Sequence, residues 1–211
     1  MKHLIIIGAR GWGREICALA KGCRGYDEEF DIKGFLDDKT TALDDTPGYP
    51  PIIDSVEHYE PQADDVFTCA MGDAHWKRHY AEMVLKKGGR FISLVHKSAY
   101  VGHNTHMGQG CIVCNGVSIS CDIEIGDFVT FQRLADVGHD ARIGSYAHLG
   151  TKSFMGGYSS IGEESTIQTS GIVLPHISVG NHCLVGAGAV VIRKVKDGQT
   201  VYGNPAKVLK Y

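Results

Sequence analysis

A six-residue period governs the apolar positions in the second half of the chain. Counted in sixes from Val101 to Val191, sixteen successive positions carry a bulky apolar residue without one insertion. Glycine directly follows ten of them, and the residue two places earlier is often small. Neither the helical period nor the alternation of a single strand produces this register.

The six-residue period instead predicts a parallel β-helix built from hexapeptides. Each hexad forms one short strand and a turn, three hexads close a triangular coil, and successive coils stack about 4.8 Å apart. We expect the repeated apolar residue to point inward and the small residue to let the chain turn the corner. The sixteen hexads make just over five coils.

Before about residue 95 the pattern changes to apolar runs that alternate with helix-like segments. This alternation predicts a small α/β unit of the Rossmann-like type, with a parallel sheet. Strands are expected near residues 3–7, 31–36, 66–71 and 91–94. The chain is therefore expected to comprise an α/β domain, a β-helix domain and a C-terminal tail, at residues 1–94, 95–200 and 201–211.

The predicted strands end in residues that are typical of a nucleotide site. The loop at residues 8–13 reads G-x-x-G-x-G and offers backbone N–H groups at a helix N-terminus, where phosphate or ribose oxygens bind. Its spacing departs from G-x-G-x-x-G, which favours another nucleotide over a nicotinamide cofactor. Asp37, Asp38 and Gly72 end the next strands, so one crevice is expected to hold a ligand. The alternative is a tight turn with solvated acids.

Composition and charge exclude several functional classes. The 21 basic and 24 acidic residues give a formal net charge of -3, so we expect no nucleic-acid or membrane partner. The N-terminal apolar run is too short for a signal peptide and no run reaches transmembrane length, which predicts a cytoplasmic protein. The seven cysteines suggest no disulfide framework, and Cys111-x-x-Cys114 lacks a second pair, so no metal is expected.

One ionisable pair, His139-Asp140, stands in a coil segment whose other residues are mostly small or apolar. It follows the inward Val137, at a turn where a side chain reaches solvent or a neighbouring subunit. Imidazole has an unperturbed pKa of about 6.5 and accepts a proton at neutral pH, as a general base must. The adjacent carboxylate can fix the tautomer and stabilise the imidazolium. The alternative is a surface histidine beside a solvated aspartate.

The coil matches the motif [LIV]-G-x-x-x-x over about 90 residues and resembles the left-handed β-helix of the hexapeptide-repeat acyltransferases. The segments LIIIGARGWG, GFLDD, AMGD, LVHKSAYV, VGHD and YGNPAKVL resemble, in that order, the sialic acid O-acetyltransferase and nucleotide-amino-sugar N-acetyltransferase family of bacterial glycan assembly. The resemblance implies transfer of an acetyl group from acetyl-CoA to the amino group of a nucleotide-linked amino-deoxy sugar, with His139 as general base. It also implies a homotrimer with sites between subunits.

The same resemblance implies roles for further residues. The nucleotide sugar would be bound by Arg10, Gly11, Trp12, Asp37, Asp38 and Gly72, with Gln132 near the sugar. Acetyl-CoA would be bound by His148, Thr169 and Ala187. Asp140 would raise the basicity of the histidine. The first loop of the family often reads G-x-x-G-H-G, and Trp12 here replaces the histidine.

The distribution of basic residues adds a second part to the expected cofactor site. Residues 101–191 contain three lysines and arginines, whereas residues 193–210 contain five. We therefore expect the last coil and the tail to meet the phosphate-bearing nucleotide end of coenzyme A through Lys194 and Lys207. The alternative is a solvated terminal tail.

Three other functions remain open from the sequence. The first is O-acetylation of sialic acid or a related sugar. The second is that of the hexapeptide-repeat carbonic anhydrases, whose coil this chain also resembles but which lack the N-terminal unit. The third is a non-catalytic scaffold, which would bind no acetyl-CoA.

Overall fold

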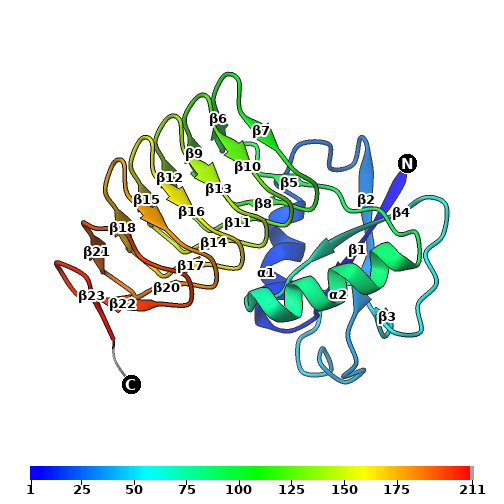
Figure 1. Ribbon diagram of the computed structural model, residues 1–211. Helices are drawn as coiled ribbons and strands as arrows, with labels where there is room; N and C mark the ends of the chain where they lie inside the picture. The colour runs from blue at the N-terminus through cyan, green and yellow to red at the C-terminus, as the bar shows by residue number, and fades with distance from the viewer. Residues whose placement is uncertain (210–211) are drawn as a thin grey trace. The chain divides into compact units, whose positions relative to one another are not determined.

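The computed structural model describes residues 1–209, so the last two residues of the expected tail lie outside it. The chain divides into two compact units, one from Met1 to Lys97 and one from Ser98 onward (Figure 1). The first unit thus ends at Lys97, whereas the sequence pattern predicts a boundary after residue 94.

The first unit contains a parallel sheet and two helices. Its elements are β1 (Lys2–Ile7), α1 (Gly11–Ala20), β2 (Phe30–Leu36), β3 (Ile52–Asp54), β4 (Asp65–Cys69) and α2 (Ala74–Lys86). The strand order is β3-β2-β1-β4, and all three neighbouring pairs are parallel. Because β1 has a neighbour on each side and Leu4 to Ile7 are fully buried, its apolar run is continuous rather than alternating.

Two details of this sheet differ from the prediction. The sequence pattern misses β3, whose three residues are all half-buried and show no alternation of burial. The strand expected at 91–94 does not extend the sheet, because Phe91 makes only an isolated bridge with Phe67 and β5 covers Leu94–Val95.

The two helices are formed by different local signals. The buried residues of α1 recur at the spacing of one helix face: Gly13, Ile16, Cys17 and Ala20. Helix α2 begins with a side-chain cap, because the Asp73 carboxylate accepts a hydrogen bond from the backbone N–H of Trp76 at 3.0 Å. Within residues 1–209, no helix is long and apolar enough to cross a lipid bilayer.

The second unit is a left-handed parallel β-helix (Figure 1). Sixteen strands of two residues each end in the apolar residue of successive hexads. They are β6 (Tyr100–Val101), β7 (His106–Met107), β8 (Ile112–Val113), β9 (Ser118–Ile119), β10 (Glu124–Ile125), β11 (Thr130–Phe131), β12 (Asp136–Val137), β13 (Arg142–Ile143), β14 (His148–Leu149), β15 (Phe154–Met155), β16 (Ser160–Ile161), β17 (Thr166–Ile167), β18 (Ile172–Val173), β19 (Ser178–Val179), β20 (Leu184–Val185) and β21 (Val190–Val191). The tail adds β22 (Thr200–Tyr202) and β23 (Lys207–Val208).

The short strands form three sheets, one for each face of the triangular coil. Sheet I contains β7, β10, β13, β16 and β19; sheet II contains β8, β11, β14, β17, β20, β22 and β23; sheet III contains β6, β9, β12, β15, β18 and β21. Within a sheet each hexad strand pairs in parallel with the one three hexads later, as Val137 of β12 does with Met155 of β15. The predicted β-helix and its period are confirmed.

The conformation of the corners differs from the expectation. The small residues two places before each apolar position, such as Ala135, Ala141 and Ala147, are buried in the coil and do not make the turn. The turn is made three residues after the inward residue, where fifteen successive positions from Asn104 to Gly188 have φ between +52° and +69°. Most of them are not glycine, so the ladder hydrogen bonds between coils must hold a conformation that costs about 1 kcal/mol per residue.

Truncation of an inward side chain tests how much this core contributes. Phe131 is fully buried, so Phe131→Ala should lower the free energy of unfolding by about 3–5 kcal/mol, because it leaves a cavity. The control is Leu134→Ala at the next corner, where the side chain is 52% exposed and the cost should stay below about 1 kcal/mol. Urea unfolding measures both, and equal losses would contradict an interior packed through the hexad positions.

Candidate active site

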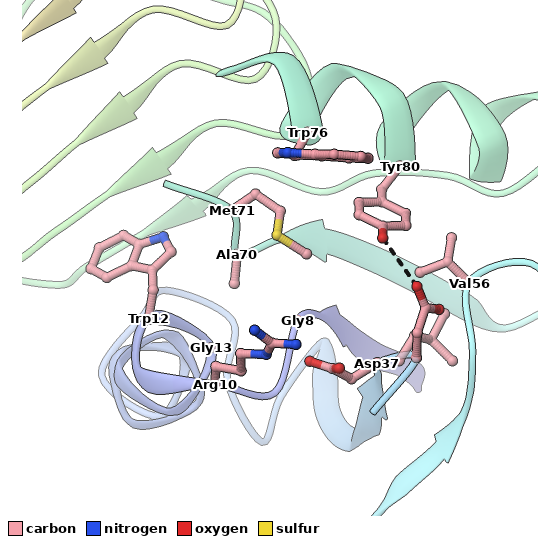
Figure 2. A pocket seen from close by; sticks show the side chains of 12 residues that line it. Gly8, Arg10, Trp12, Gly13, Asp37, Val56, Ala70, Met71, Trp76 and Tyr80 are labelled. Atoms are coloured by element: carbon pink, nitrogen blue, oxygen red, sulfur yellow. Dashed lines mark hydrogen bonds between the residues drawn. The ribbon is translucent and has the colours of Figure 1, made fainter. Parts of the chain in front are cut away.

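A cavity of about 260 Å³ lies in the first unit, at the carboxyl ends of its parallel strands (Figure 2). Gly8 follows β1, Asp37 and Asp38 follow β2, and Ala70 and Met71 follow β4. The complete lining is Gly8, Arg10, Trp12, Gly13, Leu36, Asp37, Asp38, Val56, Ala70, Met71, Trp76 and Tyr80. Four of the residues predicted to bind a nucleotide sugar therefore share one cavity: Arg10, Trp12, Asp37 and Asp38.

One end of the cavity is acidic. The Asp37 carboxylate accepts hydrogen bonds from the backbone N–H groups of Ala9 and Lys39, both at 2.9 Å, which fix its orientation. The Tyr80 hydroxyl donates to Asp38 at 3.1 Å, and burial together with that nearby carboxylate raises the pKa of the tyrosine. Tyr80 therefore stays a donor at neutral pH, and the exposed Asp38 keeps acceptor capacity for a ligand.

The other end of the cavity offers hydrogen-bond donors. Arg10 is the N-cap of α1 but makes no side-chain cap, so the first N–H groups of the helix keep their capacity to donate. Figure 2 shows the guanidinium of Arg10 between Trp12 and Asp37. A helix N-terminus and a guanidinium together favour an anionic group at this end.

Two aromatic residues of α2 were not predicted as part of the site. Trp76 and Tyr80 are four residues apart and therefore lie on the same face of the helix, with ring centroids 6.0 Å apart. Trp76 is 51% exposed, which leaves its surface available for stacking. The W-x-x-x-Y spacing is the sequence signal for them, but it does not distinguish a ligand-facing aromatic pair from a core-facing one.

Two predicted glycines do not line the cavity. A Cβ atom added at Gly11 or Gly72 would meet nothing within 4 Å, so packing does not require glycine at either position. The aspartate that follows Gly72 serves as the cap of α2. Ligand contacts of these two glycines stay predictions.

A second group of ionisable side chains lies at a corner of the β-helix, in the turn after β12. His139 Nδ1 lies 2.8 Å from Asp140 Oδ2, and the two side chains are 53% and 40% exposed. Asp140 occupies the left-handed corner position, with φ of 58°, and this geometry brings neighbouring side chains together. With the carboxylate at Nδ1, the Nε2 atom is left to exchange a proton with a ligand.

Residues of the next two coils surround the imidazole. The His139 ring packs over Gly157, where an added Cβ would lie 2.9 Å from both Cε1 and Nε2. The Tyr158 ring lies perpendicular to it, with centroids 5.2 Å apart, and is stacked in turn on His176 at 5.0 Å. The histidine thus has defined neighbours although it is largely exposed.

An additional carboxylate lies one coil earlier at the same corner. Asn104 donates to Asp122 at 2.8 Å, and this hydrogen bond is the largest cause of a lowered pKa for Asp122. Cys121 and the nearby His103 and His139 act in the same direction. No cluster of three or more metal-ligating side chains occurs in the described part of the chain.

The remaining predicted residues lie elsewhere on the β-helix. Gln132, Thr169 and Ala187 occupy turns that follow strands of sheet II, whereas His139 follows a strand of sheet III, so two different edges carry them. The Gln132 side-chain oxygen accepts hydrogen bonds from the N–H and hydroxyl of Thr151, at 3.2 and 3.1 Å.

The last three residues predicted to bind the cofactor are His148, Lys194 and Lys207. His148 is the first residue of β14 and is only 8% exposed, and its contact with acetyl-CoA stays a prediction. Lys194 and Lys207 are both exposed, and Lys207 lies in β23, which pairs antiparallel with β22.

Comparisons with known proteins bear on both units. The PglD N-terminal domain family matches residues 3–84. The chain is 31% identical to the acetyltransferase domain of PglB from Neisseria gonorrhoeae FA1090, over 99% of this chain and 100% of that one, with a TM-score of 0.90. It is 26% identical to PerB from Caulobacter crescentus, solved with CoA and GDP-perosamine, over 100% and 98% of the two chains, with a TM-score of 0.89. It is also 26% identical to the GDP-perosamine N-acetyltransferase of Escherichia coli O157:H7, over 71% of this chain and 70% of that protein.

The packing of His139 against Gly157 can be tested with two glycine substitutions that should have different effects. Gly157→Ala should displace the imidazole from Asp140 but change the free energy of unfolding by less than about 1 kcal/mol, because the clashing atoms belong to an exposed side chain. Gly138→Ala should cost about 1–3 kcal/mol, because its added Cβ would lie 2.6 Å from the backbone nitrogen of Gly157. Imidazole nitrogen chemical shifts and urea unfolding report the two effects. An unmoved His139 in the Gly157 variant would show that the ring does not pack there.

Proposed function

Because this chain belongs to the hexapeptide-repeat sugar acetyltransferases, we propose that it transfers an acetyl group from acetyl-CoA to the amino group of a nucleotide-linked amino-deoxy sugar. The relatives support this substrate pair, since PerB was solved with CoA and GDP-perosamine and the PglB domain with acetyl coenzyme A. The observation that carries the proposal is the 2.8 Å contact between His139 and Asp140 at an exposed corner of the coil.

In the proposed reaction His139 acts as general base. The neutral amine of the sugar attacks the thioester carbonyl, a C–N bond forms, and Nε2 of His139 takes the proton that the nitrogen loses. The C–S bond then breaks, and the thiolate of coenzyme A leaves and takes up a proton. Asp140 holds Nδ1 and stabilises the imidazolium that forms meanwhile.

The cavity of the first unit is the proposed site for the nucleotide. Its acidic end, at Asp37 and Asp38, can accept hydrogen bonds from a base or a ribose. Its donor-rich end, at Arg10, Trp12 and the start of α1, suits the diphosphate. Contacts from Gly11, Gly72 and Gln132 to the same substrate remain part of the proposal.

We further propose a homotrimer in which the reacting groups meet between subunits. Three of the residues predicted to bind the cofactor lie on or just after sheet II, at His148, Thr169 and Ala187, whereas His139 and Lys194 follow strands of sheet III. A single chain therefore carries part of the predicted cofactor site on a different edge from His139, and a neighbouring copy could supply that part next to His139. Apolar side chains exposed on and beside sheet III support such a contact: Phe154, Leu174 and Ile192. The cytoplasmic location predicted from the sequence belongs to the same proposal.

The activity can be tested with acetyl-CoA and a panel of UDP-, dTDP- and GDP-linked amino sugars, with free sialic acid included. We expect release of free coenzyme A and a product heavier by one acetyl group with at least one amino sugar. Transfer to sialic acid alone would replace the proposal by O-acetylation. The absence of both transfer and a thermal shift with acetyl-CoA would refute it.

The general base can be tested by substitution. His139→Ala should lower kcat/KM by about 10²–10⁴-fold, because the proton of the attacking amine loses its acceptor. The matched control is His103→Ala, which changes a histidine at the same hexad position and the same corner two coils earlier. If both variants kept full activity, His139 would not be the base.

The cofactor role of the terminal lysines can be tested by charge reversal. Lys194→Glu and Lys207→Glu should each raise the KM for acetyl-CoA by about threefold to tenfold, because a charge pair with a phosphate becomes a repulsion. The KM for the sugar nucleotide should stay constant. Lys86→Glu on α2 of the first unit is the control, and unchanged cofactor KM values in the two test variants would remove this part of the proposal.

A further inference from the structure

Trp12 holds a hydrogen-bond donor that no group within the described residues satisfies. The Nε1 atom of its indole is buried and finds no hydrogen-bond partner within residues 1–209. An indole nitrogen can only donate, so a buried one must be satisfied by something other than the folded chain or carry a desolvation penalty. Most buried polar atoms in native proteins are satisfied, and an exception requires an explanation.

The position of the indole indicates which kind of acceptor can hydrogen-bond to its N–H. Trp12 is the second residue of α1 and lines the same cavity as Arg10, the N-cap of that helix. In Figure 2 the indole nitrogen is on the side of the ring turned towards Met71, and Asp37 and Tyr80 lie at the far side of the view. The unsatisfied donor is therefore separated from the acidic end of the cavity.

The charges of the cavity further indicate which kind of ligand atom the Trp12 N–H binds. The first N–H groups of α1 lie next to Trp12 in the chain, and the Arg10 guanidinium lies between Trp12 and Asp37 (Figure 2). All of these groups are donors with positive or partly positive charge. The acceptors of the cavity, Asp37 and Asp38, already receive protein donors and lie at the other end. An anionic oxygen is the ligand atom that three such donors share best.

We propose that the Trp12 indole N–H donates a hydrogen bond to a phosphate oxygen of the nucleotide sugar, and so makes Trp12 a determinant of affinity for the diphosphate rather than for the base. This inference rests on the proposed nucleotide site. It differs from a packing role, in which the ring would matter and the N–H would not. It also differs from stacking on a base or sugar, for which the face of the ring would suffice.

Trp12→Phe separates these roles, because it removes the N–H donor and keeps an aromatic ring, although a smaller one. Binding is measured by titration calorimetry with GDP and UDP, and with guanosine and uridine, which lack phosphates. We expect the variant to bind the better diphosphate about tenfold more weakly, the typical effect of one hydrogen bond to a charged group, and the nucleoside as the wild type does. The melting temperature without ligand should change by no more than a few degrees, because no hydrogen bond within residues 1–209 is lost and only the packing of a half-buried ring changes.

Trp76→Phe is the matched control, since it removes the other indole of the cavity. Trp76 is 51% exposed, so solvent can satisfy its N–H, and this variant should leave the ratio of diphosphate to nucleoside affinity unchanged. The proposal is overturned if Trp12→Phe binds diphosphates as the wild type does, weakens nucleosides equally, or melts several degrees lower. A wild-type protein that binds no nucleoside diphosphate would overturn the nucleotide site as well, which distinguishes that failure from a failure of the Trp12 contact alone.

Discussion

The β-helix depends on one backbone constraint, the left-handed conformation of every sixth residue from Asn104 to Gly188. Phe128, Tyr146 and Tyr158 occupy such positions although bulky residues disfavour them. The conformation persists because each hexad strand pairs with strands one coil above and below, and a single relaxed corner would break the ladder on both sides. The apolar residue of each hexad also stabilises the coil, since from Val113 to Val191 it is at most 6% exposed.

The same constraint determines where reactive side chains can stand. Inward positions belong to the core, so ionisable groups are confined to the first residue of each strand and to the corners. His139 and Asp140 use two consecutive corner positions, and the left-handed turn at Asp140 lets its carboxylate reach the imidazole of its own neighbour. The rigid ladder then fixes Gly157 and Tyr158 against the ring from the following coil. A histidine that is largely exposed to solvent is in this way held by backbone geometry rather than by burial.

Much of the fold could be predicted from the sequence because the six-residue period of apolar residues has no interruption. The sixteen hexads predicted the strands of the second unit, and the alternating runs predicted three of the four strands of the first sheet. The corner conformation was not readable, because few of the corner residues are glycine and the small residues suggested a different turning point. In the cavity, Arg10, Trp12, Asp37 and Asp38 follow from strand ends, whereas Trp76 and Tyr80 required knowing which face of α2 meets the strand edges.

The parallel stacking of coils also fixes the distances between residues along the axis of the second unit. Strand β12, which precedes His139, and strand β21, which precedes Lys194, lie in the same sheet with β15 and β18 between them. Three coil spacings separate them, roughly 14 Å at the usual distance between hydrogen-bonded strands. This axial length is set by the backbone and is insensitive to side-chain substitution. A chain of this kind can change this axial distance only by gaining or losing a complete coil. The number of coils, rather than individual side-chain contacts, would therefore determine which length of extended donor molecule fits.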